Sequence, residues 1–91
     1  MKLVIYKYAL LLGRSSTLLP DGAKVLKVAE QFPTDQHLSL WALVDLEAPV
    51  GPRIFVVYGT GHPVDSTEKL QHIDTVLSCG GTYVWHVFEV L

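Results

Sequence analysis

Short apolar runs, rich in β-branched and aromatic residues, alternate along the whole chain with clusters of glycine, proline and aspartate. Such runs are typical of strands in an antiparallel sheet, and the clusters between them are typical of turns. Six segments have this character: residues 2–12, 24–31, 37–46, 53–58, 72–78 and 82–90. The pattern predicts a single, mainly β domain over residues 1–91. It would be a small antiparallel sheet, a sandwich or a partly open barrel of about six strands, with at most one short helix.

The apolar residues within the segments predict their places in the sheet. Residues 2–12 are apolar at odd and even positions alike, so we expect a central strand that is covered on both faces. Residues 37–46 and 53–58 flank a loop with two prolines and are expected to pair as a hairpin. A second hairpin is expected around Gly80 and Gly81, because adjacent glycines tolerate the positive φ values of a tight turn.

Three further segments concern turns and helices. Residues 19–23 combine Pro20 with Asp21 and Gly22, which predicts a turn. Residues 24–31 also have apolar positions at helical spacing, but their charged residues leave no clean polar helical face, and this favours a strand. Residues 65–70 have Asp65 or Ser66 as a candidate N-cap and could form one helical turn.

Charge is scarce in this chain. Charged residues make up 18% of it, against about 25% in a typical domain, whereas apolar residues make up 49%. A surface with few charges leaves apolar groups exposed, which favours self-association or a protein partner. The net charge is −2 and the lysines are scattered, so the chain has no cluster to neutralise phosphates and nucleic acid is not expected as a partner.

Cysteine usage and the apolar runs bear on the compartment. The single cysteine, Cys79, excludes an internal disulfide and fits a reducing environment. No stretch approaches the roughly 20 uninterrupted apolar residues of a membrane-spanning helix, so no membrane association is expected. The N-terminus loosely imitates a secretion signal, but Lys7 interrupts its apolar run and no A-x-A site follows. We therefore expect a protein that works inside the cell.

Candidate chemistry is concentrated in the segment Gly59-Thr60-Gly61-His62-Pro63. Its glycines could let the backbone approach an anion, with N–H groups and the Thr60 hydroxyl as donors. The segment lacks the third glycine of a dinucleotide loop and the lysine of a Walker A loop. The alternative is structural, a strand end that bends sharply with His62 held extended before proline. The ligand-binding candidates are Gly59, Thr60, Gly61, His62, His72 and His86.

The histidines raise the question of a metal or catalytic site. His62, His72 and His86 could converge if the last three strands are neighbours, and His72 and Asp74 would share a strand face. Their separations, 10 and 14 residues, match no compact zinc pattern. Cys79 with His86 is the only pair that suggests nucleophilic catalysis, and Cys79 is expected at an exposed hairpin tip without an oxyanion site. We predict no catalytic residue, no metal site and no cofactor, which disfavours an enzyme.

Aromatic residues give the more specific signal for a binding surface. They exceed what plain sheet packing needs, and tryptophan and tyrosine are the residue types that anchor protein interfaces. The alternative is that two sheet layers, or a sheet closed on itself, bury most of them. The candidates for a protein interface are Tyr8, Trp41, Tyr58, Tyr83 and Trp85.

Three segments together carry a resemblance: Gly59-Thr60-Gly61-His62-Pro63, Leu40-Trp41-Ala42-Leu43-Val44-Asp45 and Val84-Trp85-His86-Val87-Phe88-Glu89. With Leu19-Pro20-x-Gly22-Ala23, they make the chain similar to a family of short uncharacterised proteins of tailed bacteriophages and prophages. Those relatives often have His-x-Gly-Thr-Val where this chain has His72-Ile73-Asp74-Thr75-Val76, so strand regularity is in doubt there. The resemblance implies a phage or prophage product active in the host bacterial cytoplasm, and no known reaction.

Three functions follow as hypotheses. The leading one is an accessory protein that binds a host or phage protein, to counter host defence or redirect host machinery. The second is a nucleotide- or small-molecule-binding protein, or a weak phosphate-transforming enzyme, that uses the Gly59–Pro63 loop and the nearby histidines. The third is a self-assembling structural homodimer in which exposed aromatics bury each other.

Overall fold

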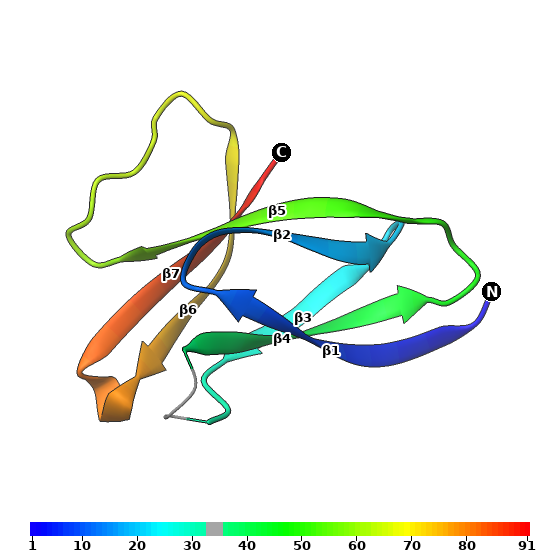
Figure 1. Ribbon diagram of the computed structural model, residues 1–91, viewed down its shortest axis with the longest axis horizontal. Coiled ribbons are helices and arrows are strands. Elements are labelled where there is room, and N and C mark those ends of the chain that lie inside the picture. Colours follow the sequence, from blue (N-terminus) through cyan, green and yellow to red (C-terminus); the bar gives the residue numbers. More distant parts are fainter. Residues whose placement is uncertain (33–35) are drawn as a thin grey trace.

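The computed structural model describes residues 1–32 and 36–91 as two packed antiparallel sheets (Figure 1). One sheet has the strand order β1-β4-β3 and the other has the order β2-β5-β7-β6. The sheets do not close into a barrel, so the mainly β prediction is confirmed as a sandwich. The strands are β1 (Leu3–Leu11), β2 (Gly13–Pro20), β3 (Lys24–Ala29), β4 (His37–Asp45), β5 (Val50–Gly59), β6 (Leu70–Ser78) and β7 (Tyr83–Val90), with a 3-10 helix at Cys79–Gly81.

The core lies between the sheets, because alternate residues of each strand point inwards. In β4 the even-numbered residues 38–44 are buried, whereas Trp41 and Leu43 between them are half-buried on the outer face. Fully burying one large apolar side chain contributes roughly 1.5–3 kcal/mol, so this layer supplies most of the stability. The largest fully buried side chains are Phe55, Leu10, Leu19, Leu40, Val28, Val44 and Val87.

Side-chain contacts join the two sheets along the edges of β3 and β6. The Asp74 carboxylate accepts a hydrogen bond from the backbone N–H of Val28 at 3.1 Å and pairs with Lys27 at 3.2 Å. At the other end of the sandwich the chain itself passes from β1 to β2 through Leu12. Gly13 has a φ of 90°, a conformation that glycine adopts readily and that permits this sharp bend.

The connection between β5 and β6 runs back along the outer face of the second sheet. Since β7 is antiparallel to both strands, β5 and β6 are parallel, and residues 60–69 must return along the strand length. Glu68 of this connection pairs with Arg14 at 2.8 Å, and the backbone N–H of Asp65 donates to the Tyr58 hydroxyl at 3.5 Å. Both partners lie on the outer face, where Val56 is only 4% exposed.

β1 is an edge strand, so the expectation of a central strand over residues 2–12 is wrong. β4 takes the centre of its sheet, between β1 and β3. Apolar residues on both faces indicated burial but could not indicate neighbours, and Leu3 and Ile5 of β1 remain 53% and 60% exposed.

The expected hairpin of residues 37–46 with 53–58 is also wrong. β4 pairs with β1 and β3, whereas β5 pairs with β2 and β7 in the other sheet. Because both edges of β4 are occupied, the turn after Asp45 carries the chain across the sandwich. The strand that pairs with β5 in addition to β7 is β2. The sequence does not predict β2, because Gly13–Thr17 reads as a polar run.

Three local expectations are confirmed. β3 is a strand, and β6 and β7 form a hairpin whose tip has positive φ at Cys79, Gly80 and Gly81. The penultimate strand is irregular where it was in doubt, with a register shift between His72 and Asp74.

The helical turn at residues 65–70 does not form. The Asp65 carboxylate instead accepts hydrogen bonds from the Thr67 backbone N–H at 2.9 Å and from its hydroxyl at 2.6 Å. The Asp65 side chain thus forms a turn that replaces the helical hydrogen bonds, and the chain enters β6 at Leu70.

Candidate functional site

Tyr83 and Trp85 stand at the end of the sandwich where the β6–β7 hairpin faces the β1–β2 corner. Both lie on β7 and point towards the opposite sheet, because alternation along the strand places them on the side of buried Val87. Their rings are stacked, with ring centroids 6.0 Å apart and an interplanar angle of 25°. Trp85 packs against the core, whereas Tyr83 is 54% exposed. We call these two residues the aromatic pair.

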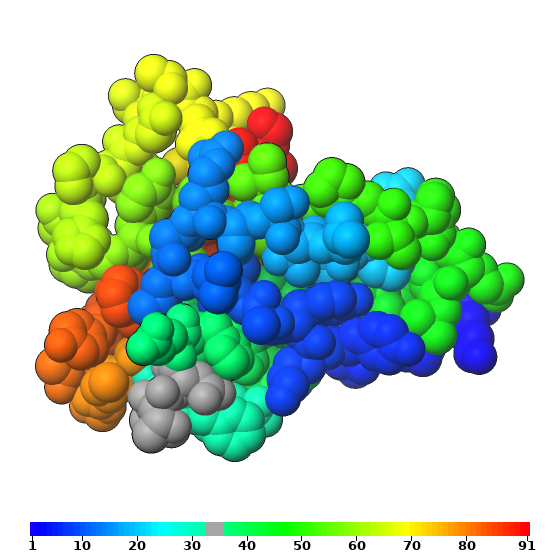
Figure 2. All heavy atoms as spheres, in the orientation of Figure 1, coloured from blue at the N-terminus to red at the C-terminus, as the bar shows by residue number. Residues whose placement is uncertain are grey.

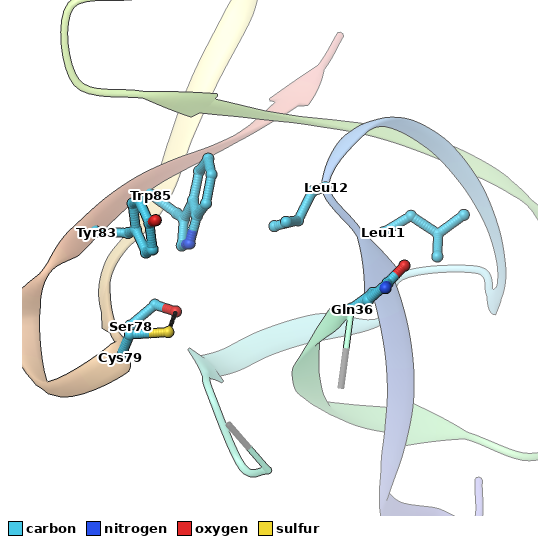
Figure 3. Close-up of a pocket in the computed structure, with 7 residues that line it drawn as sticks. All are labelled: Leu11, Leu12, Gln36, Ser78, Cys79, Tyr83 and Trp85. Atoms are coloured by element: carbon cyan, nitrogen blue, oxygen red, sulfur yellow. Dashed lines mark hydrogen bonds between the residues drawn. The ribbon is translucent and has the colours of Figure 1, made fainter. Parts of the chain in front are cut away.

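A groove of about 480 Å³ opens on one side of the aromatic pair. Figure 3 shows Leu12 pointing across it towards Trp85, with the hairpin tip forming the opposite wall. Leu11, Leu12 and the rings of the aromatic pair supply the apolar lining, and polar atoms come from Gln36, from Ser78 and Cys79, and from the Tyr83 hydroxyl and the Trp85 indole nitrogen (Figure 3). Such a site accepts a bulky apolar side chain and offers hydrogen bonds at its border. The lining residues are Leu11, Leu12, Gln36, Ser78, Cys79, Tyr83 and Trp85.

A second cleft, of about 350 Å³, lies beside the strand end of β5 and shares the aromatic pair with the groove. It is lined by Gly59, Thr60, His62, Thr82, Tyr83, Val84 and Trp85. The aromatic pair therefore forms a partition with one recess on each side. Gly59, Thr60 and His62, which were predicted to bind a ligand, line the second cleft. Tyr83 and Trp85, two of the five residues predicted for a protein interface, line both the groove and this cleft.

The Gly59–His62 turn is closed on itself. The backbone N–H of His62 donates to the Gly59 carbonyl at 3.1 Å, and the backbone N–H of Gly59 donates to Nδ1 of the His62 ring at 3.2 Å. A Cβ at position 59 would lie 2.7 Å from Cε1 of that ring. Glycine is needed here so that the imidazole can lie on the backbone, and Gly61 supplies the positive φ, 87°, of the turn.

A chain of hydrogen bonds links the other two candidate histidines on the outer face of the second sheet. The Thr60 hydroxyl shares a hydrogen bond with Nε2 of His86 at 2.8 Å. Thr75 then lies between two imidazoles, 3.3 Å from Nδ1 of His86 and 3.0 Å from Nε2 of His72. When the His86 ring is neutral, one of its nitrogens donates and the other accepts, so one threonine then donates to His86 and the other accepts from it.

Both nitrogens of His86 are thus engaged, and the ring is fixed by two hydroxyl groups. This arrangement orients Thr60 at the border of the second cleft rather than presenting His86 to a ligand. His72 also packs edge-on against Phe88, with ring centroids 5.4 Å apart.

The expectation that His72 and Asp74 share a strand face is wrong. The register shift between them places His72 opposite Phe88 and Asp74 opposite Val87, which are on opposite faces of β7. Within residues 1–32 and 36–91, no group of three or more histidine, cysteine, aspartate or glutamate side chains is placed to hold a metal ion.

The five predicted interface residues do not form one surface. Only Tyr83 and Trp85 come together. Tyr8 is on the inner face of β1, where burial raises the pKa of its phenol. Trp41 is on the outer face of the other sheet, and Tyr58 packs edge-on against Phe88 at 6.1 Å.

The residues that complete the groove were not predicted. Leu11 and Leu12 read as the end of a buried strand, and Gln36 lies directly before the predicted segment 37–46 and carries no chemical signal of its own. The one clue was Gly13 directly after an apolar run, which is typical of a bend. Their approach to Trp85 depends on the packing of the two sheets.

The comparisons with known proteins give one result. The model of a protein family described as a domain of unknown function (DUF7352) matches residues 1–91. No match was found among curated proteins or solved structures. In the described part of the chain, no helix has the length and apolar character needed to cross a membrane.

Proposed function

The chain belongs to the DUF7352 family, and from that premise we propose that it is a small phage or prophage accessory protein that binds a host or phage protein in the bacterial cytoplasm. Its binding would counter host defence or redirect host machinery. The observation that carries the proposal is the aromatic pair, which stands between two recesses at one end of the sandwich.

The aromatic pair has the properties of an interface anchor. Tryptophan and tyrosine supply large contact areas with few rotatable bonds, and they dominate binding energy when they sit at a well-formed pocket. Trp85 is held from both sides, since β7 pairs with β5 and with β6. Little conformational entropy is lost on binding when the anchor is already ordered.

The lining of the groove supports a proposal for the chemistry of the partner segment. Leu12 and Trp85 would enclose a bulky apolar or aromatic side chain, and Gln36 with the Ser78 hydroxyl would bond to the flanking backbone. A segment of this kind belongs to a protein loop or an extended peptide. The scattered lysines outside the groove are consistent with the expectation that nucleic acid is not the partner.

The test is capture from host lysate with the tagged full chain and three variants. Tyr83→Ala and Leu12→Ser remove the two sides of the groove at exposed positions, and Leu18→Ser is the matched control on the outer face of β2. We expect one discrete protein that is retained by the control and lost with both groove variants, each with an unchanged circular dichroism spectrum. Retention of that protein by both groove variants would contradict the proposal.

A second candidate function is binding of a nucleotide or small molecule in the cleft beside Gly59. It is favoured by the position of the Thr60 hydroxyl and His62 next to an aromatic wall, because such a wall can stack on a planar group. Native mass spectrometry of the purified protein tests this directly. A bound small molecule that is lost with His62→Ala and kept with Leu12→Ser would favour this candidate over a protein partner.

A further inference from the structure

Three of the four sheet edges have features that block pairing with another strand. The N–H of Val28 that points outwards from β3 is taken by Asp74, and β6 contains a register shift next to that same residue. β2 is rich in polar residues and ends in Pro20, which has no N–H to donate. Natural sheets avoid aggregation through such bulges, prolines and side-chain contacts.

β1 lacks this protection over most of its length. Its nine residues stay in continuous register with β4 from Leu3 to Leu11, and Lys7 is its one charged residue. Leu3, Ile5 and Tyr6 are 53%, 60% and 47% exposed. Figure 2 shows β1, in dark blue, along one border of the molecule. A long, regular and apolar edge is the type of strand that recruits another strand.

The hydrogen-bonding direction of this edge is set by β4. The backbone N–H of Leu46 donates to the Lys2 carbonyl at 2.9 Å, so the even-numbered residues of β1 bond to β4. The N–H and C=O groups of Leu3, Ile5 and Lys7 therefore point away from the sheet. They form a ladder of donors and acceptors on the open side.

We propose that β1 pairs antiparallel with β1 of a second copy of this chain, about a two-fold axis at Ile5. The two three-stranded sheets would join into one continuous sheet of six strands, in the order β3-β4-β1-β1-β4-β3. Such an interface is isologous, because the same strand contributes on both sides.

The register follows from the side chains. With the axis at Ile5, the two Ile5 side chains meet, Leu3 faces Lys7 of the second copy, and Tyr6 faces Val4. Opposed apolar pairs stabilise an antiparallel ladder, whereas like charges directly opposite each other destabilise it. An axis at Lys7 would place the two lysines opposite each other, so the charge selects the register around Ile5.

Charge also opposes a dimer through the outer face of the same sheet. Lys7 and Lys27 flank Trp41 on this face, and Lys24 lies beside Leu43. Stacking two such faces would bring lysines together, whereas edge pairing leaves them in solvent. The axis at Ile5 is also far from Leu12, so the dimer leaves the groove at the aromatic pair open.

Sedimentation equilibrium of the full chain over a range of concentrations tests the proposal. We expect a reversible dimer, and Ile5→Lys should raise its dissociation constant by about tenfold or more, because it places two lysines opposite each other at the axis. The matched control is Leu18→Lys, which makes the same change at a residue of β2 that is 64% exposed. A monomer at every concentration, or a dimer weakened equally by both variants, would overturn the proposal.

Cysteine cross-linking tests the register in a Cys79→Ser background. Opposed residues of a hydrogen-bonded antiparallel pair have Cα atoms about 5.5 Å apart, within disulfide range. We expect Ile5→Cys to form a covalent dimer under mild oxidation and Leu3→Cys to form none, because the two Leu3 residues are offset by four positions. Efficient cross-linking by Leu3→Cys alone would overturn the register. Tyr83→Ala should leave the dimer unchanged, which separates this result from the test of the groove.

Discussion

Arg53 and Glu89 form an ion pair on the inner side of the second sheet. Replacing one partner should lower the free energy of unfolding of the sandwich. Nε and Nη2 of Arg53 donate to the two oxygens of Glu89, each at 2.7 Å. Nη1 also donates to the carbonyl of Ala23 in the β2–β3 turn. One guanidinium thus ties β5 to β7 and to the turn between the sheets.

The expected cost of breaking the pair follows from its burial. The Glu89 side chain is 10% exposed and that of Arg53 is 25% exposed. Removing one partner of a fully buried pair costs about 3–5 kcal/mol, because the other charge is left without compensation. Since Arg53 retains some contact with water, we expect about 2–3 kcal/mol for either Arg53→Met or Glu89→Leu.

The double variant Arg53→Met with Glu89→Leu should be much closer to the original protein. It leaves no isolated charge, and apolar side chains of similar size often replace a buried pair at little cost. We expect its free energy of unfolding within about 1 kcal/mol of the unmodified chain, after allowing for the lost bond to Ala23.

Urea and thermal unfolding at pH 7, followed by circular dichroism, measure these differences. A change of 1 kcal/mol shifts the melting temperature of a domain of this size by roughly 4–8 °C, so each single variant should melt about 10–20 °C lower. Additive losses, with the double variant as unstable as the sum of the singles, would refute the view that the two charges compensate each other.

Three further predictions concern individual contacts. Partial burial opposes the ionisation of Asp74, but its hydrogen bonds, led by the N–H of Val28, lower its pKa. The stability it provides should be present above its usual pKa of about 3.9 and be lost as pH falls through the lower folded value. Asp74→Asn should therefore flatten the acid limb of the pH profile of unfolding, and an unchanged limb would contradict this role. Gly59→Ala should displace the His62 ring and break its bond to the backbone, at a cost of about 1 kcal/mol, visible as shifted His62 resonances in NMR spectra. Ser15→Ala should raise the melting temperature or leave it unchanged, because the Ser15 hydroxyl is buried without a hydrogen-bond partner among the described residues; a clear fall would show that the hydroxyl is satisfied.

Local signals in the sequence were enough to locate most of the strands and the tightest turn. The charged residues of segment 24–31 leave no clean polar helical face, which predicted the strand β3, and Gly80 with Gly81 predicted the β6–β7 tip. These features depend on the conformational preferences of a few adjacent residues. β2 was not predicted, because its polar residues take strand geometry only through pairing with β5.

The sequence predicted only those parts of the candidate site that depend on adjacent residues. The Gly59–His62 segment was identified by its composition, and its role as a closed turn became clear only from the His62 ring lying on the Gly59 backbone. Likewise, Trp85 was recognised as an aromatic anchor, but nothing near it in the sequence indicated Leu12 as the opposite wall of the groove.

Strand partners and faces are long-range properties of this fold. The apolar character of β1 is plain in the sequence. Its place at an edge depends on β4, which pairs with β1 on one side and with β3 on the other and so occupies the centre of the sheet. The single-residue bulge at Ile73 moves Asp74 to the inner face, where it joins the two sheets. A strand's pattern shows which residues are apolar, whereas its neighbours depend on the free energy of the whole packed sandwich.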